Sequence, residues 1–315
     1  MITLLLLACA AGPTSDGTPV DDTAVDDAVD QRLSFADVTA APANGEQWYG
    51  PEAVLEPGEE LQYCLFGTYD GPDIGISTYE SFQSEIGHHL ILLGTTASDL
   101  DYPDGTVVDC TQTNDMMTSF EPLINAEPTG AGSSYINLPE GMAVKLDQGQ
   151  RWVVQAHWLN STPERVRVRD VLNMGYVAED EVETWAAAFA LTQVDLSLPP
   201  QQASTLTFDC SFPADYNLLY LTGHMHENGE RFRFELGDGA TMETLYEIEE
   251  WDPSYRDAPP LTHFEAGEQP FAANTTLRTT CDWYNATDEA IEFPNEMCAT
   301  YGMLYPSLNP VVCSD

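Results

Sequence analysis

The chain has few basic residues. Ten Lys and Arg stand against 52 Asp and Glu among 315 residues, which gives a formal net charge of −42. A surface this acidic repels nucleic acid and anionic lipid headgroups, so the composition excludes both as general partners. It suits a secreted protein in a salt medium that screens the self-repulsion. High solubility alone accounts for it equally well.

Long apolar runs are also missing. No run of 18 or more apolar residues occurs, so the sequence predicts no membrane-spanning helix. Hydrophobic residues nevertheless make up 43% of the chain, which is typical of a folded protein with a proper core. At this length we expect either one large domain or two ordinary ones.

The first residues, MITLLLLACAAG, resemble a bacterial lipoprotein signal (1–9) that ends at Cys9, the residue expected to carry the lipid. The run is short and no Lys or Arg precedes it. Residues 10–45 are rich in Asp, Pro, Gly and Thr, a composition that cannot bury a core and predicts a flexible acidic tether. We therefore expect a protein of the bacterial cell envelope, lipid-anchored in the periplasm or at the cell surface, or else secreted. A lipid on Cys9 would be its only contact with a membrane.

Cysteine is scarce, and its spacing excludes a C-x-x-C zinc or redox site. Setting Cys9 aside leaves six cysteines, an even number, and the spacing leaves open which of the many pairings they form. Structural disulfides outside the cytoplasm are the favoured interpretation. The six residues are Cys64, Cys110, Cys210, Cys281, Cys298 and Cys313.

After residue 45 the chain consists of short alternating segments rich in β-branched and aromatic residues, separated by Gly, Pro, Asn and Asp. One helix-like stretch, 185–196, is followed by Pro-Pro and favours a strand. The pattern predicts an all-β protein of sandwich or jelly-roll type. The acidic stretch 177–183 is the best candidate for a boundary between two such units. The other predicted strands are 61–67, 88–94, 151–158, 165–170, 204–209, 217–222, 231–236 and 275–283.

Two of the six histidines lie one residue apart in LTGHMHENGERFRFEL, residues 221–236. Asn228-Gly229 is a strong hairpin signal, so we expect 217–227 and 230–236 to pair as neighbouring strands. Alternate side chains of a strand share a face, so His224 and His226 can converge on one metal ion. A third ligand must come from elsewhere. On the same face we expect Tyr220 and Thr222, and on the apolar face Leu219, Leu221 and Met225.

The segment RWVVQAHWLN predicts a strand with one apolar face and one more polar face. His157 shares the second face with Gln155 and Val153, and the apolar face carries Trp152, Val154, Ala156 and Trp158.

In EIGHHLILLG, two adjacent histidines would point to opposite faces of an ideal strand. Gly87 permits a bulge there, but periodicity alone predicts that one of His88 and His89 is a ligand and the other a buried structural residue. Each histidine taken singly has an ordinary structural explanation. Five of the six nevertheless fall in three strand-like segments, and the sixth, His263, lies in loop-like sequence and is expected to be a surface or structural residue.

Four motifs together resemble the copper type II, ascorbate-dependent monooxygenases, the family of peptidylglycine α-hydroxylating monooxygenase and dopamine β-monooxygenase. They are GHHLILLG, VVQAHW, LTGHMHENG and FPNEMCATYGMLYP, in family order, within residues 60 to 313. The resemblance implies two jelly-roll β-sandwich domains, 46–178 and 179–315, with one copper site each, facing one another across a cleft. It also implies hydroxylation of a substrate C–H bond by O2, with ascorbate or a similar small reductant supplying electrons.

The resemblance assigns ligands to both copper ions. His88, His89 and His157 would hold the electron-transfer copper, with Gln155 beside it. His224, His226 and Met297 would hold the copper that binds oxygen. A thioether favours Cu(I) and is a poor ligand for zinc, which agrees with this assignment. The disulfides implied are Cys64–Cys110, Cys210–Cys313 and Cys281–Cys298.

The sequence departs from the peptide-amidating members of the family at one position. Where those enzymes have an arginine that binds the substrate carboxylate, this chain has Thr222. Tyr301 matches a tyrosine near the substrate. The missing arginine and the acidic surface argue against a peptide carboxylate and for another small organic substrate, whose identity the sequence leaves open.

Two other functions compete with this one. A non-catalytic copper-binding or electron-transfer lipoprotein would keep the ligands without turnover. A zinc hydrolase built on His-x-His would need a third ligand and a general base, and the adjacent Glu227 is expected to point to the opposite strand face from the histidines.

Overall fold

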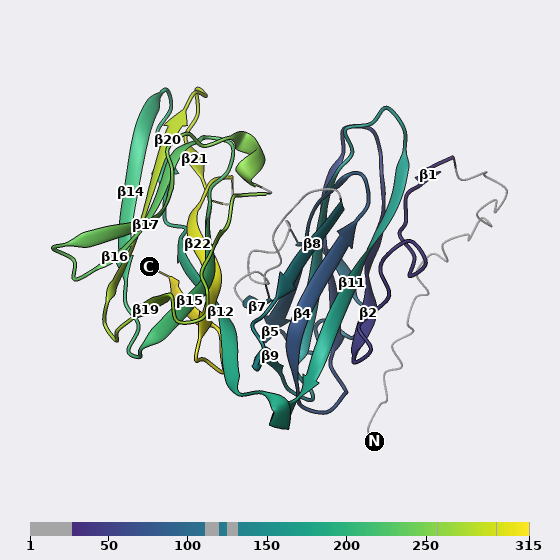
Figure 1. Cartoon of the computed structure of the whole chain (residues 1–315). Coiled ribbons are helices and arrows are strands. Elements are labelled where there is room, and N and C mark those ends of the chain that lie inside the picture. Colours follow the sequence, from purple (N-terminus) through teal and green to yellow (C-terminus); the bar gives the residue numbers. More distant parts are fainter. Residues whose placement is uncertain (1–26, 111–119, 125–131, 257, 294, 315) are drawn as a thin grey trace, which may run out of the picture.

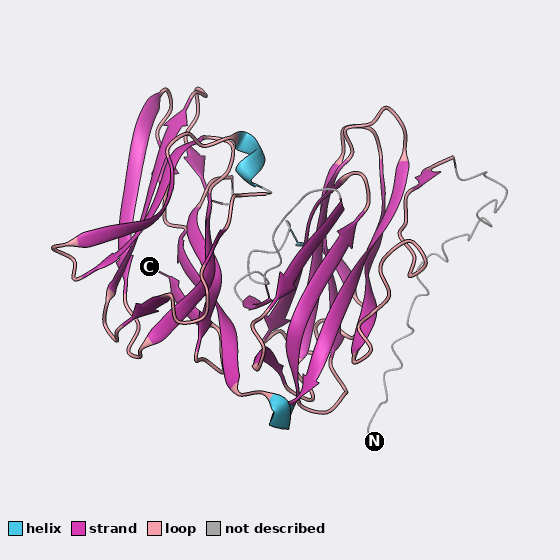
Figure 2. Ribbon diagram, in the orientation of Figure 1, coloured by secondary structure: helices cyan, strands magenta, loops and turns pink. Residues whose placement is uncertain are grey.

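The computed structural model describes residues 27–110, 120–124, 132–256, 258–293 and 295–314 of the chain. The protein is all-β, as the alternating pattern predicted, and the described residues contain no α-helix (Figures 1 and 2). Every strand predicted from the sequence is confirmed, including the helix-like stretch 185–196, most of which lies in a strand.

The strands of the first half precede the short 3-10 turn η2 (Glu179–Glu181). They are β1 (Val29–Asp30), β2 (Gly45–Leu55), β3 (Glu60–Thr68), β4 (Ile74–Gln83), β5 (Gly87–Thr95), β6 (Val107–Asp109), β7 (Phe120–Ile124), β8 (Gly132–Asn137), β9 (Met142–Leu146), β10 (Arg151–Leu159) and β11 (Val166–Ala178).

The strands of the second half follow η2, and a second 3-10 turn, η3 (Pro253–Arg256), lies among them. They are β12 (Thr184–Gln193), β13 (Ser197–Leu198), β14 (Gln202–Cys210), β15 (Tyr216–His224), β16 (Gly229–Gly237), β17 (Met242–Ile248), β18 (Thr262–His263), β19 (Gln269–Phe271), β20 (Thr276–Asn285), β21 (Ile291–Glu292), β22 (Cys298–Tyr305) and β23 (Val311–Ser314).

In each half, two sheets enclose an apolar core. In the first half, the sheet β6-β3-β10-β5-β7 faces strands β2, β11, β4, β8 and β9, and Leu55, Ile76, Leu92 and Trp158 are fully buried between them. In the second half, the sheet β14-β20-β16-β17 faces β12, β22 and β15 across a core that contains Phe189, Phe232 and Leu277. Alternation along each strand therefore puts one set of side chains into a core and the other set outside it.

The two halves are joined through a sheet as well as through the chain. Strand β9 pairs in parallel with the start of β12, opposite Thr184, so one large sheet runs from the first half into the second. The side chains of Leu219, Tyr220 and Met303 pack into the core cluster of the first half. The acidic stretch 177–183 contains η2, at the point where the chain passes between the halves (Figure 1).

The hairpin predicted around Asn228-Gly229 is wrong. Strand β15 pairs with β18, β19 and β22, whereas β16 pairs with β17 and β20 in the opposite sheet. The chain crosses from one sheet to the other at this turn, because both strands have apolar side chains that face a shared core. Phe232 of β16 and Leu221 of β15 both belong to that core.

The predicted faces of β15 hold from residue 220 onward. Leu221 and Met225 lie in the core of the second half, and His224 is partly exposed. Leu219 was predicted to point the same way as Leu221, and this is wrong. The pairing with β22 shifts register between Leu218 and Tyr220, and this irregularity turns Leu219 toward the core of the first half.

The N-terminal signal and Cys9 lie outside the described residues. Residues 10–45 were predicted to form a flexible tether, but from residue 27 onward this segment packs along the edge of the first half. Strand β1 pairs in parallel with β11, opposite Val166, and Phe35 stacks on Tyr49 with ring centroids 4.1 Å apart. Aromatic stacking and sheet pairing bind this acidic segment despite its composition. In the described parts of the chain, no helix is long and apolar enough to cross a lipid bilayer.

Three disulfides are present, and they are those that the family resemblance implied. Their Cα–Cα distances are 5.7 Å for Cys64–Cys110, 6.3 Å for Cys210–Cys313 and 6.0 Å for Cys281–Cys298. The first lies in the first half, and the other two lie in the second. Disulfides of this number are typical of proteins that fold outside the cytoplasm.

Candidate metal centres

A β-bulge brings both adjacent histidines of the first half to one side of their strand. His89 of β5 is paired with His157 of β10, but the next pair is Gly87 with Trp158, so His88 is the extra residue of a bulge. The prediction from strict alternation, that only one of the two histidines faces the site, is therefore wrong.

Three imidazoles come together at this bulge. The ring centroid of His157 lies 5.1 Å from that of His88 and 4.9 Å from that of His89. Because an imidazole nitrogen lies about 2 Å from a bound metal ion, two rings on one ion have centroids roughly 5 Å apart. The distance of the His157 ring from each of the other two rings is therefore compatible with a shared ion.

The polar neighbours of these rings come from β10 and β3. Gln155 is buried on the same face as His157, and its Oε1 lies 3.3 Å from Nε2 of His89. Nε2 of His157 lies 2.7 Å from Oε1 of Glu60. This hydrogen bond, with a smaller attraction to Arg256, lowers the pKa of Glu60 to about 2 against the opposing effect of partial burial. His157 itself is 2% exposed.

The second pair of histidines lies where β15 ends. The ring centroids of His224 and His226 are 5.2 Å apart, so the two imidazoles predicted to share a face are neighbours. Nδ1 of His226 lies 3.1 Å from the backbone oxygen of Asn295. If this nitrogen carries the proton and donates, Nε2 keeps its lone pair and is the atom that can bind a metal.

Met297 is held next to this pair by a buried carboxylate. Oε1 of Glu296 accepts hydrogen bonds from the backbone N–H of His226, at 2.5 Å, and of Met297, at 3.2 Å. In addition, His224 is the cross-strand partner of Ala299, two residues after Met297. Segments 70 residues apart in sequence thus meet at a single oxygen atom, which brings the backbone of Met297 next to that of His226.

Two other residues singled out by the sequence lie beside His224. The ring of Tyr301 is 5.9 Å from that of His224, and burial raises the pKa of its hydroxyl to about 12. Thr222, opposite Tyr301 on the neighbouring strand, donates from Oγ1 to the backbone oxygen of Pro260 at 2.9 Å. His263 is exposed and lies on β18, where it is the cross-strand partner of Tyr220 on β15, the strand that ends at His224.

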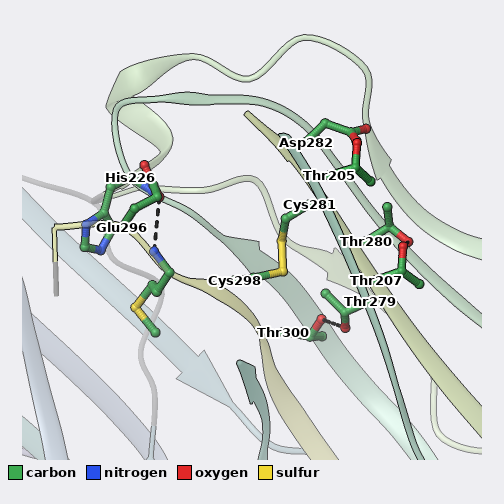
Figure 3. The surroundings of a disulfide bond; sticks show 11 residues. Thr205, Thr207, His226, Thr279, Thr280, Cys281, Asp282, Glu296, Cys298 and Thr300 are labelled. Atoms are coloured by element: carbon green, nitrogen blue, oxygen red, sulfur yellow. Dashed lines mark hydrogen bonds between the residues drawn. A yellow bond between two sulfur atoms is a disulfide. The ribbon is translucent and has the colours of Figure 1, made fainter. Parts of the chain in front are cut away.

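A disulfide fixes the strand that follows Met297. Cys298 begins β22 and is bonded to Cys281 of β20 in the opposite sheet, with a hydroxyl pair, Thr279 and Thr300, 2.7 Å apart nearby (Figure 3). In the first half, Cys64 is the cross-strand partner of Gln155, whose Nε2 lies 3.9 Å from Sγ of Cys64. A disulfide therefore lies beside each candidate centre: Cys298 is adjacent to Met297 in the sequence, and Cys64 lies on the strand next to Gln155.

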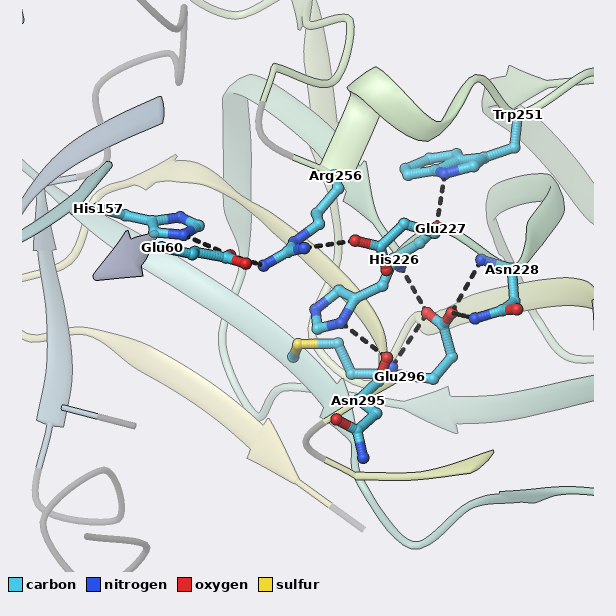
Figure 4. Close-up of polar contacts among 10 residues, drawn as sticks. Glu60, His157, His226, Glu227, Asn228, Trp251, Arg256, Asn295 and Glu296 are labelled. Carbon is cyan, nitrogen blue, oxygen red and sulfur yellow. Dashed lines mark hydrogen bonds and ion pairs between the residues drawn. The ribbon is translucent and has the colours of Figure 1, made fainter. Parts of the chain in front are cut away.

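A chain of charged side chains links the two clusters. Glu60, in contact with His157, also accepts from Nη2 of Arg256 in η3 at 2.9 Å, and Arg256 in turn contacts Glu227, next to His226 (Figure 4). A cavity of about 640 Å³ opens at this bridge, lined by Glu60, His226, Arg256 and residues of the segment 287–295. The two histidine clusters thus lie on the facing sides of the two halves.

The two candidate donor sets differ in the metals that they suit. Across the described ranges, no group of three or more His, Cys, Asp and Glu side chains is placed so that it could hold a metal ion. Nε2 of His89 faces Gln155, and Nε2 of His157 faces Glu60. The second cluster has only two such residues, and the sulfur atom of Met297 would be its third donor. Three imidazoles suit zinc as well as copper, whereas two imidazoles with a thioether would favour Cu(I).

Sequence reasoning missed Glu60, Arg256 and Glu296. Glu296 stands immediately before Met297 in the motif that carried the resemblance, so its position was visible although its contacts were not. Nothing in the sequence marks Arg256 and Glu60, which are 196 positions apart. Glu227, which was expected to point to the opposite strand face from the histidines, forms an ion pair with Arg256.

Comparison with known proteins leaves the family open. No family model and no curated protein matches the chain. Among solved structures, the chain is similar to the infectious bursal disease virus Gx strain, with 10% identity and a TM-score of 0.22 over 86% of this chain and 77% of that one. It is also similar to a protein from Eubacterium rectale described as secreted, with 8% identity and a TM-score of 0.20 over 85% and 71%.

Proposed function

We propose that the chain is a copper monooxygenase of the type II, ascorbate-dependent kind, which hydroxylates a C–H bond of a small organic substrate with O2. Each half would be a jelly-roll domain that binds one copper ion. The observation that carries this proposal is the meeting of His224 and His226 with the segment of Met297, opposite a second cluster of three histidines.

The residues of the first cluster would bind the electron-transfer copper and orient its ligands. His88, His89 and His157 would hold the copper that transfers electrons, and Gln155 would orient the ring of His89 through the contact at 3.3 Å. If His157 binds the ion through Nε2, this nitrogen would exchange its contact with Glu60 for the metal.

His224, His226 and Met297 would hold the second copper. The carbonyl of Asn295 would fix the proton of His226 on Nδ1 and leave Nε2 as the ligand atom. When bound, the copper ions would supply one-electron chemistry and the activation of O2. Tyr301 would present a protonated hydroxyl beside His224, since its raised pKa keeps the phenol neutral at physiological pH.

The charges around the bridge argue for a substrate without a carboxylate. The cavity beside His226 is lined by Glu60, Glu227 and Glu289 but by a single cation, Arg256, which is already paired with two of them. Like charges repel in such a cavity. Thr222 occupies the position of the carboxylate-binding arginine, and its hydroxyl is engaged by Pro260. We further propose that Cys9 carries a lipid that anchors the protein in the bacterial envelope.

Copper stoichiometry and oxygen consumption test the function. The protein, reconstituted with copper, is expected to bind two ions by elemental analysis and to consume O2 with ascorbate only when an organic substrate from a screen is added. Two bound ions without substrate-dependent uptake would instead support a copper-binding or electron-transfer lipoprotein. Preference for zinc over Cu(I) in a competition titration would refute both.

A further inference from the structure

Two carboxylates stand apart from the rest of this acidic protein. Of the acidic residues that the structure describes, Asp170 and Glu296 are the two that are fully buried, each with 0% exposure. Each lies directly beneath one of the two candidate centres. An ionised carboxylate out of water is costly unless hydrogen bonds compensate for its lost hydration, so the contacts of these two groups are informative.

Glu296 binds both segments that carry the ligands of the second cluster. Besides the backbone N–H groups of His226 and Met297 on Oε1, its Oε2 lies 3.3 Å from both the backbone nitrogen and Nδ2 of Asn228 (Figure 4). The carboxylate therefore joins the turn after β15 to the residue before β22, two segments that no sheet pairing connects at this point.

Asp170 has the corresponding place in the first half. Its Oδ1 accepts from the backbone N–H and the hydroxyl of Ser84, both at 2.8 Å, and its Oδ2 accepts from Nε1 of Trp158 at 2.8 Å. The backbone oxygen of Ser84 accepts from the N–H of Gly87, and Gly87 and Trp158 are the residues at which the bulge shifts the register. This carboxylate therefore joins both strands of the bulge that turns His88 and His89 to one side.

We propose that Glu296 and Asp170 are positioning residues, one for each ligand set: Glu296 holds His226 and Met297 together, and Asp170 holds the bulge of His88 and His89 against β10. The inference rests on the proposed copper function for the meaning of the ligand sets, and on hydrogen bonds alone for the positioning. Each carboxylate acts on its own centre only.

Isosteric variants test this assignment. Glu296→Gln and Asp170→Asn keep the shape and one acceptor oxygen, but they place an NH2 group against N–H donors that the carboxylate oxygen had accepted. Glu230→Gln, an exposed acid in β16 outside the cavity, and Asp180→Asn, an exposed acid in η2, are the matched controls.

Copper binding is measured for each variant by competition with a Cu(I) chelator. We expect Glu296→Gln to weaken one of the two copper equivalents at least about tenfold, with loss of copper–sulfur scattering in X-ray absorption. The Cu(II) paramagnetic resonance signal of the all-histidine centre should stay unchanged. Asp170→Asn should have the opposite pattern, and both controls should match the parent protein.

A readout without metal separates this inference from the proposed function. In the metal-free protein, amide hydrogen exchange of His226 and Met297 should accelerate at least about tenfold in Glu296→Gln and remain unchanged in Asp170→Asn. Exchange of the Ser84 amide and the Trp158 indole should show the reverse. If the parent protein binds no copper, the proposed function fails, and these exchange rates alone decide the positioning.

The inference is overturned if either variant affects both centres equally or affects neither. A merely structural role would lower the stability of a whole half and accelerate exchange throughout it. The crossed pattern, with each variant confined to its own ligands, is the result that a positioning role requires.

Discussion

The two candidate centres are built in different ways. In the first, His89 and His157 are cross-strand partners within one sheet, and a bulge adds His88. In the second, His224 ends a strand, and His226 and Met297 lie outside β15 and β22. Sheet register thus places the first ligand set, whereas loops held by side-chain hydrogen bonds place the second. Binding groups on loops over a rigid scaffold are common at functional sites.

The comparison predicts that a single loop residue can remove one centre without affecting the other. Met297→Ala is expected to lower the bound copper from two ions to one and to reduce substrate-dependent O2 consumption by more than about 100-fold, since it removes a proposed direct ligand. The circular dichroism of the fold should not change. Met225→Leu is the control, because Met225 lies between His224 and His226 in the sequence but its side chain is buried in the core. Full activity of Met297→Ala would end the copper assignment of this cluster.

In the first centre, the backbone is the sensitive element. A Cβ added at Gly87 would lie 2.7 Å from Cβ of Gln83 and 3.0 Å from the backbone oxygen of Ser84. Gly87→Ala should therefore distort the bulge, lower the free energy of unfolding by about 1–3 kcal/mol and weaken copper binding at the three histidines. Urea denaturation and copper titration measure the two effects.

The matched control is Gly50→Ala in β2, where the added Cβ would lie 3.5 Å from Leu90, an ordinary contact. Equal losses in both glycine variants would show that the bulge has no special role.

Removing one disulfide from each half distinguishes a loss of overall stability from a loss of copper binding at one centre. Replacing Cys281 and Cys298 by serine should cost about 3 kcal/mol, and it should also weaken copper binding at the second centre because Cys298 follows Met297. Replacing Cys64 and Cys110, which close a longer loop, should cost about 4 kcal/mol but leave the second centre intact. Denaturation and copper titration of both double variants provide the measurement. Equal loss of the second centre in both would mean that copper binding there depends only on overall stability.

The smallest effect is expected at the bridge between the centres. Arg256 and its partners Glu60 and Glu227 are all partly exposed, so Arg256→Ala should change the free energy of unfolding by less than about 1 kcal/mol. Substrate-dependent O2 consumption should fall severalfold, and added salt should produce the same decrease in the parent protein by screening the bridge. Arg278→Ala, which removes an ion pair with Asp209 within one sheet, should leave consumption unaltered. Oxygen uptake in Arg256→Ala equal to that of the parent at every salt concentration would exclude a role for the bridge.

Strands and their faces were predictable where alternation is regular. In 151–158, Val154, Ala156 and Trp158 fill the core, while Gln155 and His157 share the other face, as the pattern predicted. Prediction failed at bulges and at the crossing between sheets. An irregularity at Leu219 and a bulge at His88 each turn one side chain to the face opposite the one that alternation predicts. A periodic pattern in the sequence does not reveal where such bulges occur.

By itself, the sequence determined the strands, the acidic surface and the short list of candidate metal-binding side chains, because these depend on local composition and on alternation of period two. Tertiary structure alone decided which strands are neighbours, that both His88 and His89 reach His157, and that Glu296 joins His226 to Met297. These outcomes depend on which distant segments share a core and on which buried polar groups must find partners there, and neither is a property of any local stretch of chain.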